Sequence, residues 1–226
     1  MAIGDSDRAR REILARIRRA QGRGAASRPA QAELAAVETY IAAHPRGPLP
    51  AVDHDLVAGF RARAEAMQST TDLVERLAEV PGAAARYLAA HGLPRSGCVS
   101  PALAGLDWAG AGLALEARGA EDRDAVGVTG VFAALAETGT LMVVSGPETP
   151  AAASLLPETH IAVVPTGRIV QHMEDGWARA RAELGRLPRL VSFISGPSRT
   201  GDIDQTIVLG AHGPYRVHMI LVRAAT

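Results

Sequence analysis

The run Leu190-Val-Ser-Phe-Ile-Ser195, followed directly by Gly196-Pro-Ser-Arg-Thr-Gly-Asp-Ile-Asp204, indicates the fold class of this chain most clearly. The first part is an apolar run that predicts a buried strand, and the second supplies glycines, hydroxyl groups, an arginine and carboxylates. Loops of this composition that follow a strand are typical of α/β proteins that bind anions. A second loop, Gly210-Ala-His-Gly-Pro214, precedes another strand-like run at 217–222.

Similar apolar runs recur from residue 97 onward and alternate with segments that suit helices or turns. The predicted strands are Gly97–Ser100, Leu113–Ala117, Ala125–Val128, Thr140–Ser145, Ile161–Pro165, Leu190–Ser195 and Val217–Arg223. The helices or turns between them are Val131–Glu137, Ala151–Leu156 and Thr166–Leu184. This alternation predicts βαβ units and therefore an α/β fold with a largely parallel sheet covered on both faces.

The first 95 residues have mostly helical patterns. Ala9–Ala20 predicts an amphipathic helix with a basic face, for which we favour a solvated surface over a membrane- or RNA-binding arm. With the linker that follows, it forms a segment 1–30. A helical segment 31–95 precedes an α/β domain 96–226, and we expect 31–226 to form one structural unit. The helices predicted in 31–95 are Gln31–Ala43, Asp53–Met67, Leu73–Val80 and one that begins at Pro81.

Composition excludes several functions. The formal net charge is zero, which argues against a nucleic-acid binder that uses a basic domain surface. There is no lysine, so neither a lysine Schiff base nor a P-loop can form. The single cysteine, Cys98, cannot make an intramolecular disulfide or hold an iron–sulfur cluster alone, and we expect no cofactor bound by this chain. With no membrane span and no export signal in the sequence, we expect a cytoplasmic protein.

Glu137-Thr-Gly-Thr140 lies between a predicted helix and a predicted strand, where an α/β fold exposes functional groups. We consider Glu137 a candidate catalytic residue and Thr138, Gly139 and Thr140 candidate ligand-binding residues. The alternative is a helix C-terminus in which Gly139 adopts the left-handed conformation. That alternative explains the glycine but not the choice of glutamate.

The loop after residue 195 is a candidate anion site. Arg199, a second candidate catalytic residue, can supply a bidentate guanidinium, and the ligand-binding candidates are Gly196, Ser198, Thr200 and Asp202. In the competing interpretation, Ser198 and Thr200 cap a helix over Asp202–Val208 and Arg199 pairs with a surface acid. We favour the anion site because so many polar groups follow one strand.

The loop Gly210–Pro214 holds His212 between two glycines and before a proline, which predicts a tight turn. His212 is a third candidate catalytic residue, and Gly213 a candidate ligand-binding residue. His160 and His172 have no spacing typical of metal ligands, so we predict no metal site.

These motifs together resemble a known family. The matching stretches are Ala125-Val-Gly-Val-Thr129, Ala136-Glu-Thr-Gly-Thr-Leu141, Leu155-Leu-Pro157, Gly196-Pro-Ser-Arg-Thr200 and Gly210–Pro214. In this order and spacing they are similar to the lactate-utilisation protein C family, whose shared module is called the LUD domain. The resemblance spans effectively the whole chain.

The resemblance implies a Rossmann-like sheet of the NagB/RpiA/CoA-transferase type with a helical N-terminal extension. It implies a part in oxidising L-lactate to pyruvate, beside iron–sulfur partner proteins encoded in the same operon. From it we expect an accessory subunit that has no cluster and binds a small organic acid or a phosphorylated ligand near Arg199.

Two other functions stay open. The chain could be a stand-alone enzyme on a CoA-transferase-like or sugar-phosphate-isomerase-like fold, with Glu137 as base or nucleophile and Arg199 as the anion clamp. It could also be a small-molecule sensor whose basic N-terminal helix contacts a nucleic acid, although the zero net charge disfavours this and we expect no nucleic-acid partner.

Overall fold

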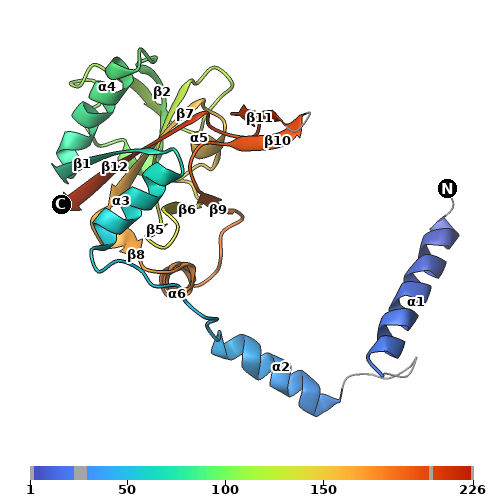
Figure 1. Ribbon diagram of the computed structural model, residues 1–226. Coiled ribbons are helices and arrows are strands. Elements are labelled where there is room, and N and C mark those ends of the chain that lie inside the picture. Colours follow the sequence, from blue (N-terminus) through green and yellow to red (C-terminus); the bar gives the residue numbers. More distant parts are fainter. Residues whose placement is uncertain (1–2, 23–29, 204–205, 225–226) are drawn as a thin grey trace. The chain divides into compact units, whose positions relative to one another are not determined.

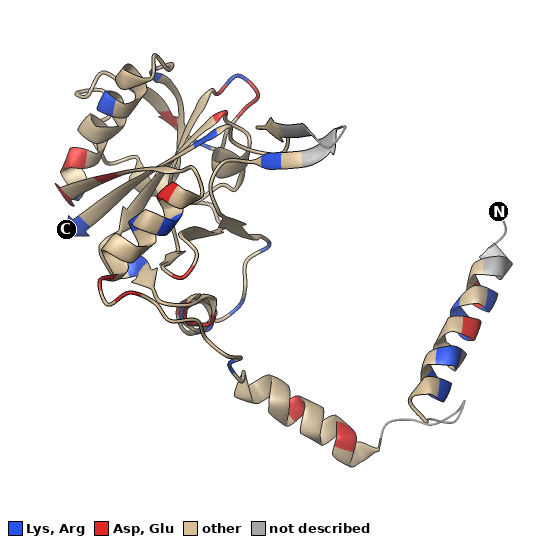
Figure 2. Ribbon diagram, in the orientation of Figure 1, with Lys and Arg blue, Asp and Glu red and all other residues tan. Residues whose placement is uncertain are grey.

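The computed structural model describes residues 3–22, 30–203 and 206–224, and it divides into two units, Met1–Pro48 and Leu49–Thr226. The first unit contains the helices α1 (Ile3–Ala20) and α2 (Gln31–Ala43) (Figure 1). Both predicted helices are confirmed, although α1 begins earlier than expected. Figure 2 shows several basic residues along α1. The apolar side chains of α1, such as Ile13 and Ile17, are exposed, and α2 buries no residue.

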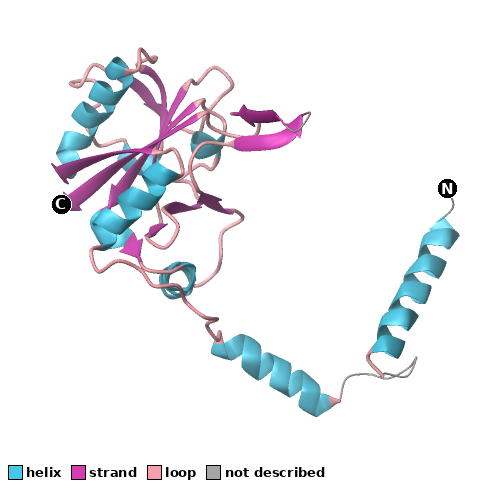
Figure 3. Ribbon diagram, in the orientation of Figure 1, coloured by secondary structure: helices cyan, strands magenta, loops and turns pink. Residues whose placement is uncertain are grey.

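The second unit is built on a six-stranded sheet in which all neighbouring strands are parallel (Figures 1 and 3). The order across the sheet is β1-β12-β7-β4-β2-β3. The strands are β1 (Thr70–Arg76), β12 (Arg216–Ala224), β7 (Thr159–Pro165), β4 (Val126–Gly130), β2 (Ser96–Val99) and β3 (Ala114–Ala117). The predicted α/β fold with a largely parallel sheet is confirmed.

Both faces of this sheet are buried, because alternate residues of each central strand enter different cores. On one face, α4 (Val80–Ala90) packs through Leu88 against Ile161 and its neighbours. On the other face, α3 (Leu56–Ala66) packs through Phe60 against Ala162 and Val164. The nearly continuous apolar sequence of β7 follows from this burial on both sides.

The second unit also contains a smaller, four-stranded sheet with the strand order β8-β5-β6-β9. β6 pairs antiparallel with both β5 and β9, whereas β5 and β8 are parallel. Its strands are β8 (Ile169–Val170), β5 (Ala133–Leu135), β6 (Thr140–Val144) and β9 (Val191–Ile194). The helix α6 (Met173–Leu184) covers it, with Ala180 against Met142.

The remaining elements are short. α5 (Ala152–Leu155) precedes β7, and 3-10 turns occur at Leu77–Glu79, Pro101–Leu103 and Thr166–Arg168. β10 (Arg199–Ile203) and β11 (Thr206–Leu209) form an antiparallel two-stranded ribbon. In the described part of the chain no helix is long and apolar enough to cross a membrane.

Strands replace one predicted helix, one segment predicted as a helix or turn, and the helix of the competing interpretation of the Arg199 loop. Leu73–Val80 contributes its first half to β1, since Thr70 to Arg76 pair in register with β12. Val131–Glu137 contains β5, because the alanines there pair between β6 and β8. The described residues of Asp202–Val208 belong to β10 and β11, whose β-branched residues favour strands. In each case pairing with another strand overrides the local pattern.

Candidate functional site

The turn between β5 and β6 places Glu137-Thr-Gly-Thr140 against the end of α3. Gly139 has φ +66° and donates its backbone N–H to the Leu135 carbonyl at 2.9 Å. A Cβ at this position would lie 2.3 Å from the backbone nitrogen of Ala64. The left-handed conformation predicted for Gly139 is therefore present, but in a strand–strand turn and not at a helix end.

The pairing of β6 with β9 brings the second motif to the same place. Leu141 lies opposite Ile194, so the hydroxyl of Thr140 hydrogen-bonds to that of Ser195 just beyond the two strands. Thr138 extends this chain by donating its hydroxyl to Thr140 at 2.8 Å. Gly196 has φ +79°, and a Cβ there would lie 2.1 Å from the carbonyl oxygen of Met67. Both glycines are needed because α3 approaches the two loops so closely.

A pocket of about 420 Å³ opens beside these hydroxyl groups. It is lined by Arg63, Ala66, Met67, Glu137, Thr138 and Ser195. Arg63 forms an ion pair with Asp53 at 2.8 Å, and this hydrogen bond lowers the pKa of Asp53. The pocket therefore combines a paired arginine, a carboxylate and two hydroxyl groups.

Glu137 is held by the start of α6. Its Oε1 accepts the backbone N–H of Met173 at 2.8 Å, and its Oε2 lies 3.0 Å from His172 Nδ1. The side chains of Glu137 and His172 are only 12% and 8% exposed. Glu137 therefore caps the N-terminus of α6, where a carboxylate also interacts favourably with the helix dipole. The sequence analysis did not connect His172 with Glu137, because the two residues are 35 positions apart.

Arg199 begins β10 and is exposed. Its Nη2 lies 3.5 Å from the carbonyl oxygen of Met67. Met67 is at the end of α3, where backbone carbonyls have no partner within the helix. Among the described residues, no carboxylate forms an ion pair with Arg199. Thr200 and Asp202 follow in the same strand, but the side chain of Asp202 lies outside the described residues. Arg199 thus contacts Met67, which lines the pocket described above together with Glu137.

The loop Gly210–Pro214 packs on Ser198. The Ser198 N–H donates to the Pro214 carbonyl at 2.9 Å, and the Gly210 N–H donates to the Ser198 carbonyl at the same distance. The His212 N–H donates to the Ser198 hydroxyl at 3.3 Å, whereas the side chain of His212 is exposed. Ser198 is thus hydrogen-bonded to the loop Gly210–Pro214. Among the described residues, no contact connects His212 with Glu137.

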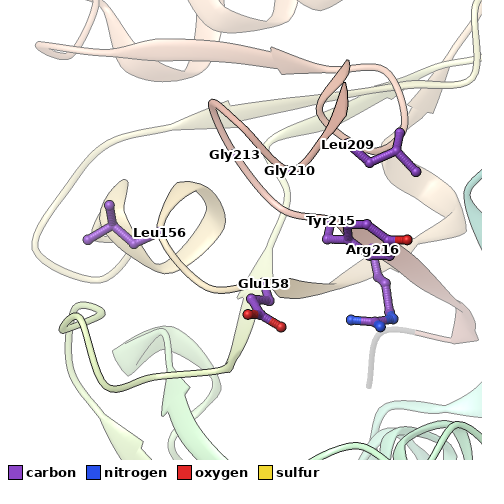
Figure 4. A pocket seen from close by; sticks show the side chains of 7 residues that line it. All are labelled: Leu156, Glu158, Leu209, Gly210, Gly213, Tyr215 and Arg216. Carbon is purple, nitrogen blue, oxygen red and sulfur yellow. The ribbon is translucent and has the colours of Figure 1, made fainter. Parts of the chain in front are cut away.

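A second pocket, of about 370 Å³, lies under this loop (Figure 4). It is lined by Leu156, Glu158, Leu209, Gly210, Gly213, Tyr215 and Arg216. The guanidinium of Arg216 lies 4.7 Å from the centre of the Tyr215 ring. In Figure 4 the side chains of Glu158 and Arg216 extend away from Gly210 and Gly213. The sequence motif ended at Pro214, so it missed Tyr215 and Arg216, which are its immediate neighbours.

Both loops lie at the amino ends of the strands of the large sheet. Gly196 lies against Met67, shortly before β1, and Pro214 lies two residues before the start of β12. The backbone N–H of Arg216 donates to Glu158, which immediately precedes β7. Ligands of open α/β sheets are usually bound outside the carboxyl ends. The loop after β9 lies at the amino ends of the large sheet's strands because β9 itself belongs to the small sheet.

No group of three or more His, Cys, Asp or Glu side chains that could hold a metal is present in residues 3–22, 30–203 and 206–224. Cys98 is buried in β2, and burial raises the pKa of its thiol to about 11. Metal ligation requires the thiolate, so this environment disfavours Cys98 as a ligand.

Comparisons with known proteins give a consistent family. Residues 104–222 match the family described as the LUD domain. Proteins named lactate utilization protein C are similar to this chain: the one from Halalkalibacterium halodurans is 38% identical over 106 residues, or 46% of each chain. The one from Bacillus subtilis is 37% identical over 100 residues, or 43% of this chain and 42% of the relative. The chain thus spans less than half the length of these curated relatives.

A solved structure is similar as well. The crystal structure of a DUF162 family protein from Deinococcus radiodurans aligns with a TM-score of 0.57 and 25% sequence identity. The alignment covers 77% of this chain and all of the other.

Proposed function

This chain belongs to the LUD domain family, and we propose that it is an accessory subunit, without a cluster of its own, of a system that oxidises L-lactate to pyruvate. The observation that carries the proposal is the match to relatives named lactate utilization protein C. We extend the fold assignment in the same proposal, from the parallel α/β sheet to the NagB/RpiA/CoA-transferase type.

The partners in this proposal are iron–sulfur proteins of the same operon. Oxidation of lactate to pyruvate releases two electrons, and a chain with one buried, protonated thiol is poorly suited to bind a cluster that accepts them. Clusters in partner proteins would fill that need. Within this chain, the proposed contribution is an anion-binding loop around Arg199.

The geometry around Met67 supports such a loop. The exposed guanidinium of Arg199 lies beside a pocket that carries the hydroxyl groups of Thr138 and Ser195. A guanidinium and neighbouring hydroxyl donors form charge-assisted hydrogen bonds with a carboxylate. Gly196 and Gly139 let both loops approach α3 closely enough to form this surface.

Growth on lactate tests the proposal. A clean deletion of the gene is expected to abolish growth on L-lactate but not on pyruvate, and the wild-type gene is expected to restore it. A tagged chain is expected to co-purify with proteins that contain iron and acid-labile sulfide. Complementation by Arg199→Ala, with Arg95→Ala as the exposed control, tests the loop separately. Normal growth of the deletion strain on lactate would contradict the accessory role.

A second candidate, a stand-alone enzyme, is favoured by one observation. Glu137 and His172 are in contact at 3.0 Å, nearly buried, beside a pocket large enough for a substrate. Buried carboxylate–imidazole pairs serve as general bases in many enzymes. Glu137→Gln keeps an oxygen acceptor for the Met173 N–H but cannot accept a proton from substrate.

Glu137→Gln is therefore expected to reduce turnover by the purified chain at least 100-fold while the protein stays folded. The measurement is a turnover assay with acyl-CoA, sugar-phosphate and 2-hydroxy-acid substrates, together with a thermal unfolding curve for each variant. Glu148→Gln, at an exposed position, is the matched control. Equal turnover by wild type and Glu137→Gln would sink this candidate.

A further inference from the structure

Arg216 also lines a further pocket, which shares Arg216 and Tyr215 with the pocket of Figure 4. This Arg216 pocket has a volume of about 190 Å³. Its lining includes Gln68, Thr70, Tyr87, His91, Tyr215 and Arg216. It lies where β1 and β12 begin, against the end of α4.

Arg216 brings a positive charge that the described protein does not neutralise. No carboxylate among the described residues forms an ion pair with it, although Glu158 lines the adjoining pocket with it, and its guanidinium lies over the face of the Tyr215 ring. The residue is half-buried. A partly buried guanidinium held against an aromatic ring is well placed to bind an anion, because its fork geometry matches a carboxylate.

Tyr87 is a fixed hydroxyl donor on the opposite wall. Its ring stacks on the buried His218 with centres 3.9 Å apart and planes 6° apart. His218 is held in turn by the Thr70 hydroxyl, 2.8 Å from its Nδ1. Burial raises the pKa of Tyr87, so its phenol stays protonated and can donate at neutral pH. Thr70, which also lines the pocket, supplies a second hydroxyl group.

His91 and Gln68 complete the wall. His91 Nδ1 is engaged by the Tyr87 carbonyl at 2.9 Å, which leaves Nε2 for a ligand or solvent. Gln68 has φ +68°, a conformation that non-glycine residues rarely adopt and that often occurs at binding sites. It directly follows Met67, so its backbone geometry is set by the same end of α3 that holds Gly196.

The charge and size of the pocket narrow the ligand class. The lining contains a single cation, and His91 caps the C-terminal end of α4, where the helix dipole disfavours a concentrated negative charge. A singly charged carboxylate fits this balance better than a phosphate dianion. The volume equals that of about six water molecules, which suits an acid of about six heavy atoms.

We propose that the Arg216 pocket binds small 2-hydroxy or 2-oxo monocarboxylates, with the carboxylate on Arg216 and the second oxygen near Thr70 and Tyr87. Arg199 does not line the Arg216 pocket, although Pro197 of the same loop does. The choice of hydroxy and oxo acids within the monocarboxylates rests on the proposed function.

Isothermal titration calorimetry of the full chain tests this assignment with L-lactate, pyruvate, propionate and inorganic phosphate as probes. Arg216→Gln is expected to weaken lactate and pyruvate binding at least tenfold, and Tyr87→Phe about fivefold. Arg216→Lys keeps the charge and is expected to retain part of the affinity. Arg95→Gln, at an exposed position, is the matched control and is expected to leave these affinities unchanged, and Arg199→Gln is measured beside it. Thermal unfolding of each variant confirms that it is folded.

Wild-type affinity of a folded Arg216→Gln variant would overturn the assignment. If Arg199→Gln alone removed binding, the Arg216 site would be wrong while the proposed Arg199 loop stood. Tighter binding of phosphate than of the acids, or no binding of any probe, would also overturn it. These binding results do not depend on growth on lactate, so the growth experiment tests the proposed function independently of them. Equal affinity for propionate and lactate would overturn the role given to the second oxygen.

Discussion

Gly139→Ala is expected to lower the free energy of unfolding by about 4 kcal/mol, because two unfavourable effects add. An alanine must adopt φ +66°, and its Cβ would lie 2.3 Å from the Ala64 nitrogen in α3. The atom it meets is backbone, so no side chain can rotate away. For a domain of this size the change corresponds to a fall in Tm of about 10 °C. Urea denaturation and a thermal scan measure both quantities.

Gly167→Ala is the control for this substitution. A Cβ at Gly167 meets no atom within 4 Å, and its φ is not in the left-handed region. Its free energy of unfolding is therefore expected to stay within about 0.5 kcal/mol of wild type. Equal stabilities of the two variants would show that α3 does not approach the turn as closely as described.

Stability is expected to fall steeply as the pH falls from about 6.5 to 4, because of two buried histidines. His160 is fully buried, with Nε2 2.8 Å from the Thr129 hydroxyl, and His218 is 4% exposed. Burial lowers the pKa of each from 6.5 to about 4. In this window the unfolded chain binds protons that the folded chain does not, so acid favours unfolding. Each histidine is expected to contribute about 3 kcal/mol of this loss.

Urea denaturation at a series of pH values measures the slope. Two histidines that titrate only when unfolded give a slope of up to about 2.7 kcal/mol per pH unit, and His160→Gln is expected to halve it. His54→Gln, at an exposed position, is expected to leave the slope unchanged. Four carboxylates have pKa values that are lowered mainly by arginine partners: Asp53, Glu79, Glu116 and Asp124. The stability that they contribute is lost below about pH 4, outside the histidine window. An unchanged slope in His160→Gln would contradict the assignment.

Much of the fold could be predicted because the large sheet is buried on both faces. Strands such as Ile161–Pro165 and Val217–Arg223 are continuous apolar runs for that reason, and their positions were confirmed within two residues. β1 was missed because it is an edge strand, half polar, whose partner lies almost 150 residues later. β5 was missed because its alanines are good helix formers, and only its neighbours in the small sheet make it a strand.

The candidate site was predictable only in part. The motifs around Thr140 and Ser195 meet through the pairing of β6 with β9, which the apolar runs alone do not specify. The part of His172 in the site could be recognised only from the fold, which places it in contact with Glu137. Arg216 and Tyr87 come from opposite ends of the α/β unit, so no local pattern connects them. The placement of individual roles on Glu137, Arg199 and His212 stays a prediction.

The position of β12 governs how this protein can be made. It is the last of the described strands in sequence order, yet it lies between β1 and β7 and pairs with both. During synthesis β1 leaves the ribosome without a partner and stays so until about 150 further residues have been added. The apolar edge of β7 is exposed in the meantime. The central pairing of the sheet therefore forms late in synthesis, and until then these two strand edges are sites where an incomplete chain can aggregate.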